Sequence, residues 1–180
     1  GSATSGGSGT GLLDATQGDI ELHLSELNVG RHRGYYGTAS GTFTTGDQTL
    51  VTTGSANVAT TSGGTATGTL NLQGGIFSAD IMNIGAGGVL HFTDGRLAVN
   101  RYNDSSSTKA LLQEGGTLAP GFSLADRLNT SLAGQSIINA AYVLESAGTL
   151  EIELFGTTPG TEYDQLLVNG FVNLNADSGS

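Results

Sequence analysis

The side chains best suited to binding or chemistry lie close together in residues 31–37, RHRGYYG. This segment holds two of the six basic residues and two of the five tyrosines of the chain. Tyrosine rings can stack on sugar faces, and guanidinium groups bind carboxylates through paired hydrogen bonds. A glycan with acidic groups is therefore a candidate ligand. The candidate binding residues are Arg31, His32, Arg33, Tyr35 and Tyr36.

A structural interpretation of the same segment is also open, and it is the one we favour. Aromatic side chains often serve in packing, so the two tyrosines could cover neighbouring strands. The two arginines could then balance the charges of Glu21 and Glu26. In that case the segment is a corner loop with no ligand.

Acidic and basic residues elsewhere could support polysaccharide cleavage. A lyase needs acidic calcium ligands and a basic proton abstractor, and Asp80, Asp94, Arg96 and Arg101 are of those types. However, Asp94 precedes a glycine as in a tight turn, and surface arginines are usually solvated. We therefore expect structural roles for these four residues.

Two glutamates raise the same question. Glu151 and Glu153 lie two residues apart, which places them ~6.6–7 Å apart on one side of a predicted strand. That spacing is compatible with the carboxyl pair of a glycosidase. Glutamates on an outward strand side are more often solvated, so no catalytic residue is predicted.

No metal or cofactor site is predicted. His23, His32 and His91 do not share a ligand spacing, and the chain has no cysteine. Sixteen acidic residues against six basic ones give a net charge of −10, which argues against nucleic-acid binding. No apolar run approaches the ~18 residues of a membrane span.

Imperfect repeats organise the chain. Residues 38–43 (TASGTF) match residues 65–70 (TATGTL), and a second series of glycine-led segments begins at Gly75, Gly95 and Gly116. Asn28, Asn57 and Asn83 occupy equivalent positions in successive units, where they could stack as a ladder. Periods of about 20 to 29 residues are typical of solenoids.

Each unit has the pattern of strands and turns. Leu70, Leu72, Leu90 and Phe92 alternate with polar residues, and glycine pairs separate the short runs. Such a unit buries its apolar side only when units stack ~4.8 Å apart. We predict an all-β chain that forms a right-handed parallel β-solenoid, the hand following from the crossover rule.

The predicted domain organisation has a short linker and one solenoid. Residues 1–11, rich in glycine and serine, are interpreted as a tag remnant and flexible linker, and residues 12–180 as a single β-solenoid domain. Residues 99–115 and 120–133 are predicted to be corner insertions, with a helical turn over residues 123–128. The strand pattern resumes at residues 141–144 and 148–154.

Three segments carry a resemblance to a known class of protein. Residues 115–121 (GGTLAPG), 142–154 (YVLESAGTLEIEL) and 160–166 (GTEYDQL) resemble repeats of autotransporter passenger-type proteins and of similar exported bacterial proteins that end in a PEP-CTERM sorting tail. The resemblance covers residues 20–175. It implies a β-solenoid and an extracellular or cell-surface location, and it transfers no catalytic residue.

The expected function is therefore structural. The chain would be a piece of a longer secreted or surface protein, acting as a stiff spacer or adhesin scaffold without catalysis. A carbohydrate-binding module or an accessory segment of a polysaccharide-degrading enzyme are the alternatives. Expected partners are extracellular glycans or other surface proteins, and an exposed solenoid end could also self-associate.

Overall fold

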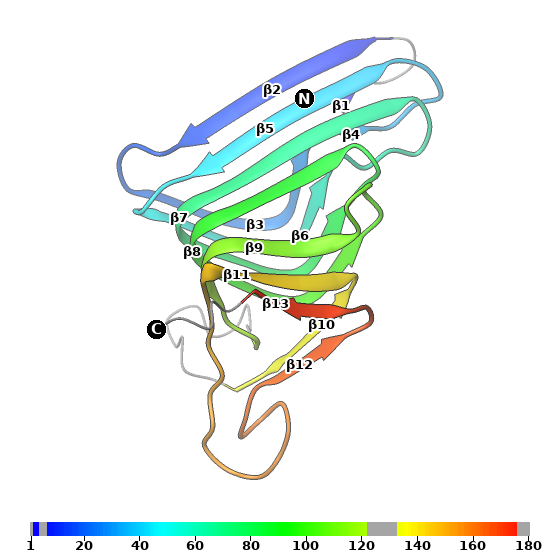
Figure 1. Ribbon diagram of the computed structural model, residues 1–180. Helices are drawn as coiled ribbons and strands as arrows, with labels where there is room; N and C mark the ends of the chain where they lie inside the picture. Colours follow the sequence, from blue (N-terminus) through cyan, green and yellow to red (C-terminus); the bar gives the residue numbers. More distant parts are fainter. Residues whose placement is uncertain (1, 4–6, 122–132, 176–180) are drawn as a thin grey trace.

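The computed structural model describes residues 2–3, 7–121 and 133–175. Within them the chain is all-β, and every named strand pairs in parallel with its neighbours in the stack. Successive coils lie above one another along the axis of the molecule (Figure 1). The predicted parallel β-solenoid is confirmed.

The coils have two long faces and a short third side. The first face stacks β2 (Ser8–Ala15), β5 (Thr38–Thr45), the first half of β7 (Thr65–Ile84), the first half of β8 (Gly88–Asp104), β9 (Ala110–Leu118), β11 (Ala141–Leu150) and β13 (Val172–Leu174). The second face stacks β3 (Ile20–Val29), β6 (Thr49–Val58), the second halves of β7 and β8, β10 (Gln135–Asn139) and β12 (Gln165–Val168). The third side begins with β1 (Ser2–Ala3) and β4 (Arg31–His32), which pair with each other.

The register of the coils follows the sequence repeats. Gly41 pairs with Gly68 and Phe43 with Leu70, as the matching segments predict. Gly75, Gly95 and Gly116 each stand at a corner between the two faces, with φ of 71°, 82° and 67°. A Cβ on Gly95 would lie 2.7 Å from backbone atoms of the coil before it, so the stacked corners leave room only for hydrogen.

Apolar side chains of successive coils form continuous columns inside the stack. Val51, Phe77, Leu97 and Leu118 occupy one such column, and each is at most 1% exposed. In β5 the alternation of the sequence becomes an alternation of buried and partly exposed side chains. Burial of each such side chain contributes about 1.5–3 kcal/mol, which no single coil could obtain alone.

A polar side chain, Gln113, interrupts an apolar column. Its hydrogen bonds are made to other groups of the protein. Gln113 is fully buried, next to Phe92 in the neighbouring coil. Its Nε2 donates to the carbonyl oxygens of Gly116 and Thr149, at 2.9 and 3.0 Å, and its Oε1 accepts from the Tyr142 hydroxyl at 2.7 Å. Burial raises the pKa of Tyr142 to about 12.

Two predicted boundaries differ from the structure. Residues 8–11, assigned to the linker, form the first half of β2 and pair with β5, so the solenoid begins earlier than predicted. Of the insertion predicted over residues 99–115, only residues 105–109 lie between strands. The Asp104 carboxylate closes this turn, accepting from the backbone N–H of Ser106 at 2.6 Å and of Ala110 at 3.2 Å.

The strand predicted over residues 148–154 is also shorter than expected. β11 ends at Leu150, and residues 151–164 leave the stack as a loop before β12 (Figure 1). Leu154 is 74% exposed although the apolar alternation of the strand continues through it. The Glu162 carboxylate holds the loop tip, accepting from the N–H groups of Thr157 and Thr158. The helical turn predicted over 123–128 lies outside the described residues.

Candidate functional site

A sharp turn sets the position of the candidate loop, residues 31–37. Gly30 ends the second face of the first coil with φ of 68°, and a Cβ there would lie 1.8 Å from the Thr67 carbonyl oxygen. The equivalent residue of the next coil, Ala59, also has a positive φ, 55°. The chain therefore turns at the same place in both coils and continues as the third side.

The two arginines of the loop are held by one carboxylate. Arg31 donates to Glu26 Oε1 and, at 3.1 Å, to Asn28 Oδ1. Arg33 lies further out, with its side chain 58% exposed and its Nη2 3.9 Å from Glu26 Oε2. The prediction that the arginines balance the charge of Glu26 is confirmed. Glu21, which was expected to do the same, contacts His23 instead.

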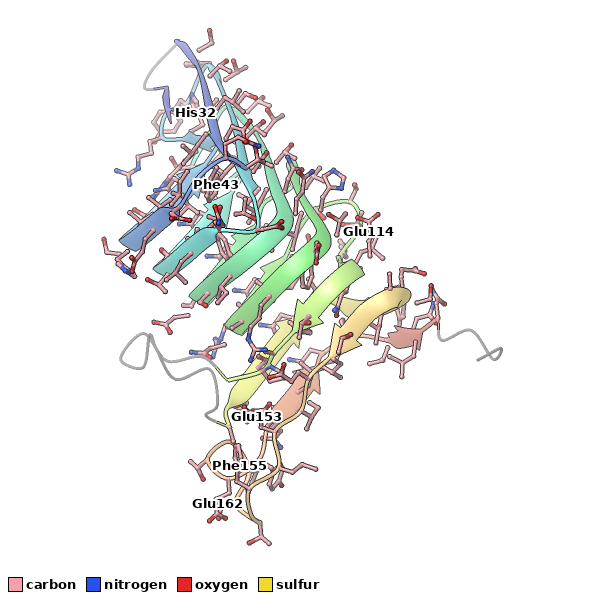
Figure 2. The ribbon with its side chains drawn as sticks, turned by 90° about the vertical axis from the view of Figure 1, so that its left-hand side faces the viewer. His32, Phe43, Glu114, Glu153, Phe155 and Glu162 are labelled. Atoms are coloured by element: carbon pink, nitrogen blue, oxygen red, sulfur yellow. The ribbon has the colours of Figure 1, made fainter. Side chains whose placement is uncertain are left out.

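His32, one of the candidate binding residues, is buried in the stack. It is fully buried, and its Nδ1 accepts from the Gly34 N–H at 3.3 Å. Its Nε2 has no hydrogen-bond partner among the described residues. A Cβ on Gly64 would lie 2.6 Å from the ring, so glycine makes the space that this ring occupies. Figure 2 shows His32 toward the end of the molecule opposite Phe155.

Both tyrosines of the loop face solvent. Tyr35 is 86% exposed and Tyr36 is 77% exposed. The suggestion that they cover the first coils is therefore wrong. Two fully exposed aromatic rings beside an exposed guanidinium group remain available to a partner.

A groove of about 500 Å³ runs between this loop and the outer side of the second face. Its lining carries guanidinium, carboxylate, imidazole, amide and hydroxyl groups and one large apolar side chain, Ile81. The lining residues are Glu26, Arg31, His32, Arg33, Ser55, Asn57, Thr60, Thr61, Ser62, Ile81 and Asn83. Such a surface can hydrogen-bond to hydroxyl and carboxylate groups of an extended polar ligand. Tyr35 and Tyr36 are not part of its lining, although they belong to the same loop.

An asparagine ladder crosses the groove and continues beyond it. The predicted stacking of Asn28, Asn57 and Asn83 is confirmed, and three further asparagines extend the ladder to six. The Nδ2 of each donates to the Oδ1 of the preceding one, at distances of 2.7 to 3.3 Å. The added members are Asn103, Asn139 and Asn169. Sequence inspection missed them because insertions of different length separate their coils.

The four residues considered for lyase chemistry do not converge. Asp94 accepts from the N–H of Gly95 within its own turn, at 2.7 Å, and Asp80 accepts from Asn100 Nδ2 at 3.1 Å. Arg96 binds Glu151 through two hydrogen bonds, of 2.6 and 2.9 Å. Arg101 pairs in register with Ile81 on the second face, one coil further along. No group of three possible metal-ligating His, Cys, Asp or Glu side chains occurs in the described part of the chain.

Glu151 and Glu153 have opposite electrostatic environments. The hydrogen bonds from Arg96 hold the pKa of Glu151 below its usual value. Desolvation, followed by the nearby Asp164 and Glu151 carboxylates, raises the pKa of Glu153. Both lie at the start of the 151–164 loop, directly after β11. The alternation of the sequence predicted that the two glutamates are neighbours, but not which groups they contact.

A carboxylate, an imidazole and a hydroxyl also line up on the outer side of the second face. His23 contacts Glu21 through Nε2 and the Thr52 hydroxyl through Nδ1. Thr52 is fully buried, so its hydroxyl is not placed to attack a substrate. The row links two neighbouring coils, because His23 pairs in register with Thr52. This contact was not predicted.

Comparisons with known proteins add no relative. No protein-family model matches the chain, and neither do any curated proteins or solved structures. Among the described residues there is no helix that could span a membrane.

Proposed function

We propose that the chain is a structural repeat module of a bacterial secreted or cell-surface protein, a stiff spacer that performs no catalysis of its own. The observation that carries this proposal is the unbroken asparagine ladder, Asn28 to Asn169, on a stack of in-register coils. Each coil is tied to the next by backbone pairing and by a side-chain amide. The extracellular location rests on the resemblance to exported repeat proteins.

Hydrogen exchange followed residue by residue tests the spacer. A stiff scaffold predicts that the amides of β5 to β8 exchange together, at the rate of global unfolding, while those of residues 31–37 and 151–164 exchange much faster. Exchange of β5 to β8 amides as fast as that of the two loops would contradict the proposal.

A second candidate function is the binding of an acidic glycan by the 31–37 loop and the adjoining groove. The observation that favours it is the exposure of Tyr35 and Tyr36 beside Arg33, whose only ion pair among the described residues is 3.9 Å long. Rings that pack against the protein would not remain so exposed. The groove beside them supplies amide and hydroxyl groups.

The test is binding to a panel of immobilised polysaccharides that includes polygalacturonate. The proposal expects binding to an acidic member and loss of that binding in Tyr35→Ala with Tyr36→Ala. Phe155→Ala is the matched control, because Phe155 is a similarly exposed ring at the opposite end of the molecule (Figure 2). No binding across the panel, or equal loss in the control, would contradict glycan binding through this loop.

A further inference from the structure

The outward side of the first face carries a regular grid of hydroxyl groups. On β2, β5 and the first half of β7, every second side chain points away from the core, which gives twelve outward positions in three neighbouring strands. Nine of the twelve are serine or threonine, and the other three are Leu12, Asp14 and Asn71. The nine residues of this hydroxyl grid are Ser8, Thr10, Thr38, Ser40, Thr42, Thr44, Thr65, Thr67 and Thr69.

The register of the stack fixes the spacing of the hydroxyl grid. The three strands pair without a shift, so Thr10 lies beside Ser40, and Ser40 lies beside Thr67. Equivalent side chains therefore repeat ~4.8 Å apart across the strands and ~6.6 Å apart along them. Figure 1 shows the three strands running side by side with little twist, so the grid forms a rectangle. Threonine is stiff about χ1, which limits the directions that its hydroxyl group can take.

Solvent is the partner available to most of these hydroxyl groups. Within the described residues, only Thr44 among the nine has a side-chain hydrogen bond, which it accepts from Asn71 Nδ2 at 3.0 Å. All nine are exposed or half-buried. Asp14, at one corner of the grid, is the one charged side chain at the twelve positions, although the chain carries a net charge of −10. Water on this surface is therefore ordered by the hydroxyl groups rather than by ions.

A stiff grid of hydroxyl groups is complementary to a solid in which hydrogen-bonding groups also repeat. Water molecules on a prism face of ice lie on a rectangular lattice with comparable spacings in its two directions. One hydrogen bond from a hydroxyl group to water contributes little, because liquid water competes for both partners. Groups held in fixed positions can bind the lattice together, so their small contributions add. A crystalline polysaccharide would instead favour aromatic rings that stack on sugar faces, and none of the twelve positions holds one.

We propose that the outward side of β2, β5 and β7 binds ice, with the hydroxyl and methyl groups of the grid seated on the ordered water of the crystal surface. This site is separate from the groove beside residues 31–37, which lies against the second face. It goes beyond the spacer function but depends on the same stiffness, because only strands in a fixed register match a lattice. Protein molecules fixed on an ice face make the ice between them grow with a curved front, which lowers the freezing temperature.

Ice affinity and thermal hysteresis test the proposal. When ice grows slowly from a dilute solution, the wild type should be incorporated into the ice, whereas ordinary soluble proteins stay in the liquid. A gap between the melting and freezing temperatures should appear and should widen with protein concentration. Thr42→Lys, on the middle strand, and Thr67→Lys, on β7, each place a long charged side chain on the grid. Each should abolish both the incorporation and the gap.

Thr157→Lys is the matched control, since it adds the same charge at an exposed threonine of the 151–164 loop, away from the grid. It should behave as the wild type does. Threonine also favours strands for reasons unrelated to binding, so unchanged melting temperatures must show that the variants fold. Thr67 is the more exposed of the two grid residues, so Thr67→Lys decides the test if Thr42→Lys disturbs folding. Exclusion of the wild type from ice, incorporation of the folded grid variants, or equal loss in Thr157→Lys would overturn the proposal.

Discussion

The asparagine ladder has the clearest energetic role of any polar feature at the scale of single residues. An inner member such as Asn83 both donates, to Asn57 at 2.9 Å, and accepts, from Asn103 at 2.8 Å. Side chains at the ladder ends have fewer partners within the ladder. Each amide hydrogen bond contributes about 0.5–1.5 kcal/mol net, and an amide left unpaired in a partly buried position costs more than one in water.

Replacement of Asn83 by alanine should therefore lower the free energy of unfolding by about 1–3 kcal/mol, because two hydrogen bonds are lost. Asn169→Ala is the control, since Asn169 is exposed and donates only to Asn139. Its cost should be at most half as large. Urea denaturation of both variants measures the difference, and equal costs would show that the ladder does not act as a chain of hydrogen bonds.

The opposed environments of Glu151 and Glu153 predict opposite pH effects. The pKa of Glu151 is lowered, so its stabilisation is present above the unfolded value of 4.5 and is lost as the pH falls through the folded pKa. The pKa of Glu153 is raised, so its ionisation destabilises the fold as the pH rises through the folded pKa.

At pH 7, Glu151→Gln should lower the melting temperature and Glu153→Gln should raise it. Each effect should be below about 1 kcal/mol, because both carboxylates are partly exposed. At an acidic pH below the lowered folded pKa of Glu151, where both glutamates are protonated in the wild type, the three melting temperatures should converge. Thermal unfolding at the two pH values measures this, and effects of the same sign at pH 7 would contradict the assigned contacts.

The residue roles in the 31–37 loop could be predicted only in part. Charge balance correctly placed Arg31 with Glu26, because opposite charges close in sequence often meet. It could not predict that His32 points inward while Tyr35 and Tyr36 point out. Those directions depend on where the corner at Gly30 falls relative to the next coil, and a two-residue strand has too little alternation to show it.

At the scale of elements, the corners determine the register of the stack. Gly75, Gly95 and Gly116 repeat at intervals that no helix interrupts, so each corner backbone lies against the one before it. The conformational cost of a positive φ and the steric cost of close stacking are separate. Two glycines of almost equal φ allow them to be measured apart.

Gly95→Ala should destabilise the protein more than Gly18→Ala. Gly18 has φ of 79° and an ideal Cβ would meet no atom within 4 Å, so alanine there should cost only about 1–2 kcal/mol for its backbone conformation. At Gly95, with φ of 82°, the Cβ would also lie 2.7 Å from the backbone of the preceding corner. Chemical denaturation of both variants gives the two costs, and a Gly95→Ala cost no larger than that of Gly18→Ala would contradict the close stacking.

The elements of the stack were predictable where repeats align without insertions. The pairing of Thr38–Thr45 with the first half of β7 follows directly from matching sequence segments. The end of the strand at Leu150, where the chain leaves the stack, could not be predicted, because the alternation of apolar and polar residues continues to Leu154. Alternation reports which side chains could face a core, whereas a strand also needs a neighbouring coil on which to pair.

At the scale of the whole molecule, stability is shared between neighbouring coils. The strands shorten from the 8 and 10 residues of β2 and β3 to the 3 and 4 residues of β13 and β12. A coil in the middle packs on two neighbours and a coil at either end on one, so unfolding should begin at the ends.

The distance between the two ends of the stack tests the proposed stiff spacer most directly. The chain has no cysteine, so Asp14→Cys with Asn173→Cys places spin labels at two exposed sites alone, on the first and last strands of the first face. Six steps of ~4.8 Å separate these strands, or roughly 29 Å, to which the label arms add. Pulsed dipolar spectroscopy on protein diluted with unlabelled chain should give a single narrow distribution at that distance. A broad distribution would contradict the stiff stacked solenoid on which the proposed function depends.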